Sequence, residues 1–163
     1  MHDAPRRLVL GLGNPDRGDD GAGRLVARLL RGHVPDDVRV EEAVGDAAGV
    51  IDALQGADWV VLVDAAVSGA PPGTIHRIDC AAGETLPARG GTSSHGLGVA
   101  EAVALARALG GLPRCCVVYA IEGLCFEPGS DVTPPVCGAA RKVAGKIAAD
   151  LEPEGAGIST LRP

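Results

Sequence analysis

The sequence predicts an α/β fold in which a mostly parallel sheet of five strands lies between two layers of helices. Short apolar runs bounded by Gly or Pro alternate with segments of helical periodicity, which is the pattern of a sheet covered on both faces. Residues 59–63 (WVVLV) leave no solvent-facing side, so we expect them to form a central strand. A chain of 163 residues fits a single domain.

The expected elements follow one another in a regular order. Strands are predicted at residues 7–13, 38–43, 59–63, 74–79 and 116–121. Helices are predicted at residues 21–31, 47–54, 93–109 and 132–151. The connection 69–73 is too short for a helix, so the strand that follows it is expected to run antiparallel. Residues 1–151 then form one domain, and residues 152–163 form a flexible C-terminal tail.

The third helix is expected to start at a serine, because Ser93 or Ser94 can cap its first turn. Helical spacing assigns a set of apolar side chains to its buried face: Leu97, Val99, Val103, Leu105 and Leu109.

Composition excludes several classes of function. The formal net charge of −6 and the scattered arginines argue against a partner of nucleic acid. No apolar run reaches the roughly 18 residues of a membrane span, and the first residues do not resemble a signal peptide, so we expect a cytoplasmic protein. Five cysteines without a C-x-x-C pair predict reduced thiols rather than a disulfide framework or a zinc knuckle. We expect a monomer rather than an oligomer.

The first polar cluster is the loop of residues 11–23, between the first strand and the first helix. It is not a dinucleotide loop, because Asp16 stands where the third glycine is needed and two adjacent carboxylates would repel a pyrophosphate. Capping of the helix explains one of Asp19 and Asp20, but not both. The loop is therefore a candidate for holding a carboxylate over the sheet edge.

Two further polar residues are expected at the same edge of the sheet. Asp64 directly follows the central strand, and His95 lies at the start of the third helix, where the helix dipole favours a neutral imidazole. The alternative for Asp64 is a strand-end carboxylate that only accepts a backbone hydrogen bond, and the alternative for His95 is a structural histidine. If Asp20, Asp64 and His95 converge, they form an open set of three ligands for a divalent ion such as nickel, zinc, iron or manganese.

The chain resembles the hydrogenase maturation protease family. The opening signature of that family matches residues 11–15 (GLGNP) and 18–23 (GDDGAG), and its acidic strand end matches residues 63–65 (VDA). The remaining matches are Gly73-Thr74, Ser94-His95 with Gly98, Glu122, Phe126-Glu127 and Thr133-Pro134. The resemblance covers residues 7–150, and this combination is far more specific than any single motif.

The resemblance implies an α/β/α fold of the phosphorylase/hydrolase-like type and an endopeptidase. Such an enzyme removes the C-terminal extension of the precursor of a nickel–iron hydrogenase large subunit once nickel has been inserted. Asp20, Asp64 and His95 correspond to the metal-contacting and catalytic residues of the family, and the nickel arrives with the substrate. Family members often carry Glu at position 20, and their loop after the second strand differs from residues 44–49, where Asp46 is the candidate to stand in.

Two other functions compete with this one. Residues 11–15 also resemble the start of a peptidyl-tRNA hydrolase, but the later motifs of that family and its basic surface are missing from this sequence. A metal-sensing chaperone would use the same three ligands without cutting a peptide bond.

Overall fold

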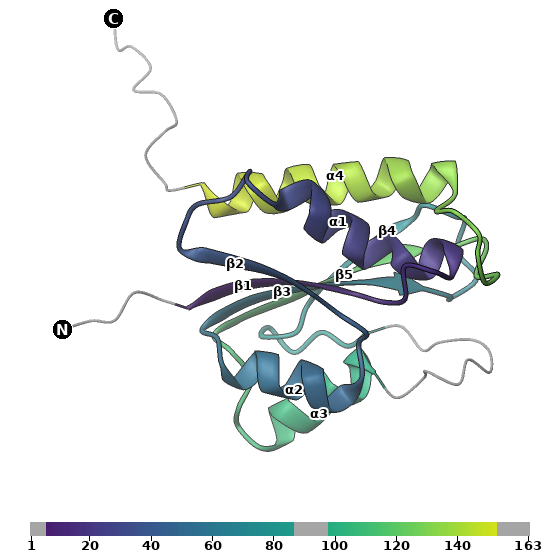
Figure 1. The fold of residues 1–163 in the computed structure, drawn as a ribbon. Coiled ribbons are helices and arrows are strands. Elements are labelled where there is room, and N and C mark those ends of the chain that lie inside the picture. The colour runs from purple at the N-terminus through teal and green to yellow at the C-terminus, as the bar shows by residue number, and fades with distance from the viewer. Residues whose placement is uncertain (1–5, 87–97, 153–163) are drawn as a thin grey trace, which may run out of the picture.

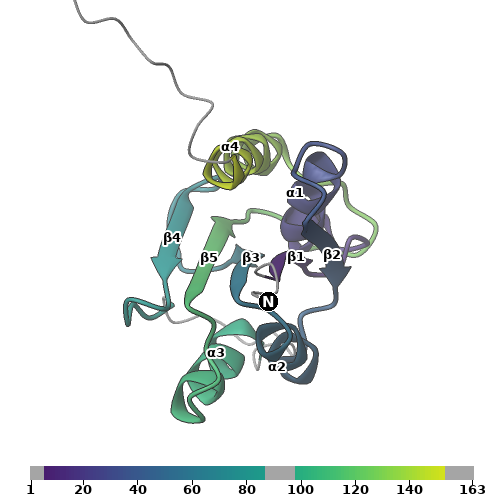
Figure 2. The same cartoon turned by 90° about the vertical axis from the view of Figure 1, so that its left-hand side faces the viewer.

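A computed structural model describes residues 6–86 and 98–152. It is a three-layer α/β/α sandwich, with a five-stranded sheet in the middle layer. Helices α1 (Ala22–Leu30) and α4 (Pro134–Leu151) cover one face, and α2 (Ala47–Gln55) and α3 (Val99–Ala108) cover the other (Figure 1 and, along the sheet, Figure 2). The predicted fold class is confirmed. No helix within the described ranges is both long and apolar enough to cross a membrane.

The sheet has the strand order β2-β1-β3-β5-β4. Its strands are β1 (Arg7–Leu12), β2 (Val38–Ala43), β3 (Trp59–Ala66), β4 (Ile75–Asp79) and β5 (Cys115–Glu122). All neighbours run parallel except β4, which is antiparallel to β5, as the short connection before it predicts. Strand β3 is central, as expected from its apolar sequence.

The side chains of β3 alternate between two cores. Val60 and Leu62 point to the side of α2 and α3, whereas Val61 and Val63 point to the side of α1 and α4. All four are buried, which is why this strand carries no polar residue before Asp64. Aliphatic side chains fill most of the thin layers, and the aromatic Tyr119 is the largest fully buried side chain among the described residues.

Two local predictions are wrong. Helix α3 begins at Val99 with Gly98 at its N-cap, and Ser93 and Ser94 lie outside the described residues. Its buried residues are Val99, Ala102, Val103 and Ala106, a stripe at helical spacing. Leu105 and Leu109 lie off that stripe and are 48% and 69% exposed. The predicted tail also lies outside the described residues, except Glu152.

Candidate active site

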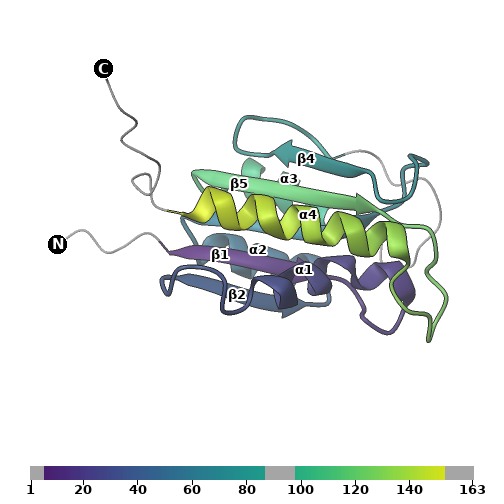
Figure 3. The same ribbon diagram turned by 90° about the horizontal axis from the view of Figure 1, so that it is seen from above.

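The candidate site lies where β1 ends and β3 continues. Pairing of β1 with β3 stops at Gly11 and Val63, whereas β3 pairs with β5 as far as Ala66 and Glu122. The chain leaves β1 through α1 toward β2 and returns to β3 through α2 on the opposite face, so the carboxyl ends of β1 and β3 form the switch point of the topology (Figure 3). Open α/β sheets bind their ligands at such a point.

Asp20 lies in a short 3-10 helix, η1 (Gly18–Gly21), which precedes α1 and packs against β3. The backbone packs so closely around η1 that two neighbouring positions, residues 13 and 23, require glycine. A Cβ at Gly23 would collide with the carbonyl oxygen of Val63, and a Cβ at Gly13, which has a φ of +115°, would collide with the carbonyl oxygen of Asp20. The backbone N–H of Asn14 donates to Asp20 Oδ2 at 2.9 Å and orients the carboxylate.

Asp64 lies inside β3, and the prediction that it follows the strand is wrong. The strand extends past Val63 because β5 continues to pair with it, so Asp64 lies opposite Ala120. The residue lies just past the last β1–β3 pair, and the N–H of Ala65 donates to its Oδ1 at 2.9 Å. The structure therefore places Asp20 and Asp64 on adjacent elements at the same edge of the sheet.

His95 lies outside the described residues, so its convergence with the two aspartates stays a prediction. Within residues 6–86 and 98–152, no group of three or more His, Cys, Asp and Glu side chains could hold a metal ion. A metal site at Asp20 and Asp64 would require a further ligand, and the prediction assigns that part to the imidazole nitrogen of His95. The side chain of Asp46 accepts from the N–H of Gly49 at 3.1 Å and caps α2, and its part in the site stays a prediction.

Asp19 is fully buried and joins η1 to the loop that follows β5. Its Oδ2 accepts from the N–H groups of Leu124 at 2.7 Å and Cys125 at 3.0 Å, and its Oδ1 accepts from the N–H of Thr133 at 2.7 Å. The Thr133 hydroxyl also donates to it at 2.8 Å. Burial alone raises the pKa of Asp19, but the hydrogen bonds from Thr133, Leu124 and Cys125 outweigh it, so the pKa lies below its ordinary value.

The adjacent carboxylates thus have different roles. Neither side chain caps the helix, because η1 and α1 have no side-chain hydrogen bond at their N-caps. Asp19 is fully buried and holds the segment between β5 and α4 through its hydrogen bonds, whereas Asp20 is only partly buried. The sequence shows the pair of carboxylates, but the partners of Asp19 lie more than 100 residues away along the chain.

A second buried carboxylate, Glu122, is the last residue of β5 and lies opposite Ala66, two residues after Asp64 on β3. It accepts from the N–H of Ser68 at 2.6 Å, the N–H of Gly69 at 3.0 Å and the Ser68 hydroxyl at 2.9 Å. His76 Nε2 lies 3.3 Å from Oε2. Burial alone raises the pKa of Glu122, but the hydrogen bonds from Ser68, His76 and Gly69 outweigh it and hold the pKa below its ordinary value. The carboxylate fixes the turn between β3 and β4.

We expect Glu122→Gln to destabilise the protein by about 1–3 kcal/mol, because an amide oxygen can replace Oε1 opposite the two N–H groups, but the amide NH₂ then replaces the acceptor Oε2 opposite the Ser68 hydroxyl and His76 Nε2, and the remaining hydrogen bonds lose their charge. The contribution of Glu122 is complete above pH 4.5, the ordinary pKa of the group, and is lost as the pH falls through the lowered pKa of the folded protein. Urea denaturation at neutral and acid pH measures both effects. Glu127→Gln, at an exposed position, is the control, and an equal loss in both variants would contradict the assignment.

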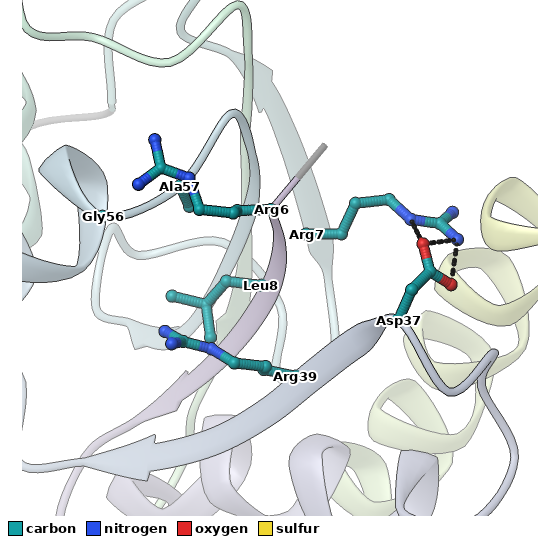
Figure 4. A pocket seen from close by; sticks show the side chains of 7 residues that line it. All are labelled: Arg6, Arg7, Leu8, Asp37, Arg39, Gly56 and Ala57. Atoms are coloured by element: carbon teal, nitrogen blue, oxygen red, sulfur yellow. Dashed lines mark hydrogen bonds and ion pairs between the residues drawn. The ribbon is translucent and has the colours of Figure 1, made fainter. Parts of the chain in front are cut away.

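The hollow at the opposite end of the sheet is not a second candidate. It has a volume of about 180 Å³ and is lined by Arg6, Arg7, Leu8, Asp37, Arg39, Gly56 and Ala57 (Figure 4). Each arginine already has a carboxylate partner, since Asp37 is 2.6 Å from Arg7, Glu41 is 3.3 Å from Arg39, and Asp58 is 3.4 Å from Arg6. The hollow is therefore balanced in charge and lies at the amino end of β1.

Comparison with known proteins agrees with the geometry. The model of the hydrogenase maturation protease family HycI matches residues 24–150. The hydrogenase expression/formation protein HupD of Thiocapsa roseopersicina is 32% identical over 127 residues, which cover 75% of this chain and 56% of that protein. HupD of Bradyrhizobium diazoefficiens is 32% identical over 137 residues, covering 80% and 70%. The chain thus spans little more than half the length of the first of these relatives.

Solved structures share the same fold. The hydrogenase maturating endopeptidase HybD from E. coli has a TM-score of 0.73 and 25% identity, with 92% of this chain and 94% of that chain covered. The NiFe hydrogenase maturation protease HycI from Thermococcus kodakarensis KOD1 has a TM-score of 0.70 and 25% identity, with 91% and 94% covered. The family match and the identity with HupD decide the assignment: the chain belongs to the hydrogenase maturation protease family.

Proposed function

We propose that this protein is an endopeptidase that removes the C-terminal extension from the precursor of a nickel–iron hydrogenase large subunit after nickel insertion. The observation that carries the proposal is the placement of Asp20 and Asp64 on adjacent elements at the switch point of the sheet. Membership of the protease family supports the reaction class. The alternative of a peptidyl-tRNA hydrolase-like esterase rests on residues 11–15 alone, whereas the family match covers residues 24–150.

In this proposal the nickel belongs to the substrate. Asp20 and Asp64 contribute carboxylate oxygens, and His95 contributes a neutral imidazole nitrogen, which suits a borderline divalent ion. A bound divalent ion can polarise the scissile carbonyl or lower the pKa of the attacking water. The residues of the enzyme hold and orient the loaded precursor, and Asn14 keeps the carboxylate of Asp20 in position through its N–H.

The two carboxylates also explain how a loaded precursor is distinguished from an empty one. Negative charges at one edge repel each other, and a divalent cation offsets that repulsion. An empty precursor brings no such cation, so it lacks the attraction between the cation and the two carboxylates and binds the site less tightly. All five cysteines are free in the structure, which agrees with the cytoplasmic location that we propose for this reaction.

We expect cleavage of precursor isolated from nickel-replete cells and no cleavage of precursor isolated from nickel-starved cells. Incubation of each with the purified enzyme, followed by mass spectrometry, measures loss of the extension. Addition of nickel to the empty precursor before incubation is the control for its folding. Equal cleavage of both forms would contradict substrate-held nickel, whereas binding of the loaded form without cleavage would favour the metal-sensing chaperone.

A further inference from the structure

Three arginines of α1 and its C-terminal end converge on one carboxylate in the structure. Glu42, on β2, is 3.5 Å from Arg24 Nη1, 3.1 Å from Arg28 Nη2 and 2.9 Å from Arg31 Nη2. The arginines occupy positions i, i+4 and i+7 of helix α1 and the residue directly after it, so they share one face. We call Arg24, Arg28 and Arg31 the arginine stripe.

The arginine stripe carries more charge than Glu42 can neutralise. Within the described part of the chain, one carboxylate against three guanidinium groups leaves an excess of two positive charges. Glu41, the adjacent acidic residue, does not neutralise the stripe, because side chains alternate between the two faces of the sheet along β2 and Glu41 pairs with Arg39 at 3.3 Å. The chain has a net charge of −6, so a local excess of positive charge is unusual on this surface.

The stripe is accessible and starts beside the candidate active site. The side chains of Arg28 and Arg31 are 52% and 53% exposed, whereas Glu42 is 11% exposed beneath them. Arg24 is more buried, and its Nε donates to the carbonyl oxygen of Gly13 at 2.6 Å, in the loop that also contacts Asp20. From there the stripe follows α1 along the β2 side of the sheet (Figure 3).

We propose that the arginine stripe is a docking surface for an acidic segment of the protein substrate. The stripe spans about 10 Å, since α-helical residues rise 1.5 Å each. An extended peptide covers that length in about three residues, so two acidic side chains of one segment can each meet one guanidinium of the excess. The stripe is too short and carries too little excess charge for a nucleic-acid backbone. Because it begins at the active-site loop, a docked segment lies next to the residues that are cut.

This inference rests on the proposed function, and two experiments separate them. The first titrates the full-length protein with hexaglutamate peptide, with hexalysine as the control, and follows the amide signals of α1 by NMR. The second measures kcat/KM for processing of the nickel-loaded precursor at several salt concentrations. Both use Arg28→Gln/Arg31→Gln, which leaves Arg24 to pair with Glu42, and a matched control on α4, Arg141→Gln/Lys142→Gln, at exposed positions.

For Arg28→Gln/Arg31→Gln we expect loss of hexaglutamate binding and a fall in kcat/KM of about tenfold at low salt, with kcat unchanged, because charge at the rim of an interface steers association. The salt dependence of kcat/KM should become shallower. The α4 control should match the wild type. Equal hexaglutamate binding and equal kcat/KM in wild type and Arg28→Gln/Arg31→Gln would overturn the docking surface.

Glu42→Gln distinguishes docking from a merely structural ion-pair cluster. Removal of this counter-charge should tighten hexaglutamate binding and raise kcat/KM at low salt if the stripe docks an acidic segment. If the cluster only anchors α1 to β2, the variant melts at a lower temperature and gains neither binding nor rate, which would refute the inference. Should the wild type fail to process the precursor, the proposed function fails, and hexaglutamate binding still decides the role of the stripe.

Discussion

Asp64→Asn and Asp20→Asn should each reduce processing of the nickel-loaded precursor at least about a hundredfold while the protein stays folded. Mutation of a group that only orients a metal ligand lowers metal affinity or activity about 10- to 100-fold, and we expect mutation of a ligand itself to lower it further. An amide keeps the size of the carboxylate but loses the negative charge that favours a divalent cation. Both residues are only partly buried at the edge of the sheet, so we expect little change in stability. His95→Ala is expected to have the same effect.

The measurement is a single-turnover cleavage assay read by mass spectrometry, with a thermal melt of every variant. Asp16→Asn is the matched control, because Asp16 lies in the same loop with an exposed side chain. Normal processing by Asp64→Asn or by Asp20→Asn would remove that residue from the site. A variant that fails to cut and also melts early would instead indicate a structural role for the carboxylate.

The fold could be predicted from the sequence because its determinants are local. Residues 59–63 are apolar without a break, which marks a strand buried on both faces, and the short connection between β3 and β4, residues 67–74, leaves no room for a crossover helix. The end of β3 could not be predicted in this way. It is decided by pairing with β5, which continues to Glu122 and keeps Asp64 inside the strand. The buried face of α3 is likewise set by packing rather than by the positions of its leucines.

The candidate site was predictable in part for a similar reason. Carboxyl ends of parallel strands meet at one edge, so residues that follow β1 and residues near the end of β3 are placed together by topology alone. The different roles of Asp19 and Asp20 could not be predicted in this way. They depend on hydrogen bonds from the loop after β5 and from Thr133, which no local pattern connects to η1. Helical spacing places the arginine stripe on one face of α1, but its pairing with Glu42 could not be predicted, because Glu42 lies on a different element.

Asp19 should be the most sensitive polar position of the part of the chain that the structure describes. Its two oxygens accept hydrogen bonds on both sides, from Leu124 and Cys125 at Oδ2 and from Thr133 at Oδ1. An amide of the same shape cannot accept on both, because its NH₂ group must face at least one N–H. An unsatisfied buried donor costs about 1–3 kcal/mol, so we expect Asp19→Asn to lose about 3 kcal/mol of the free energy of unfolding and Asp19→Ala at least as much.

Two further readouts separate this role from catalysis. The contribution of Asp19 is complete above its ordinary pKa of 3.8 and is lost as the pH falls through the lowered pKa of the folded protein, so the stability gap between wild type and Asp19→Asn should close in acid. Processing should fall with the folded fraction and recover on cooling or with a stabilising osmolyte, because Asp19 is fully buried and holds the loop that follows β5. Urea titrations from neutral pH to pH values well below 3.8 test the first expectation, with Asp16→Asn as the control. A gap that persists in acid would mean that the charge of Asp19 is not what joins η1 to the segment between β5 and α4.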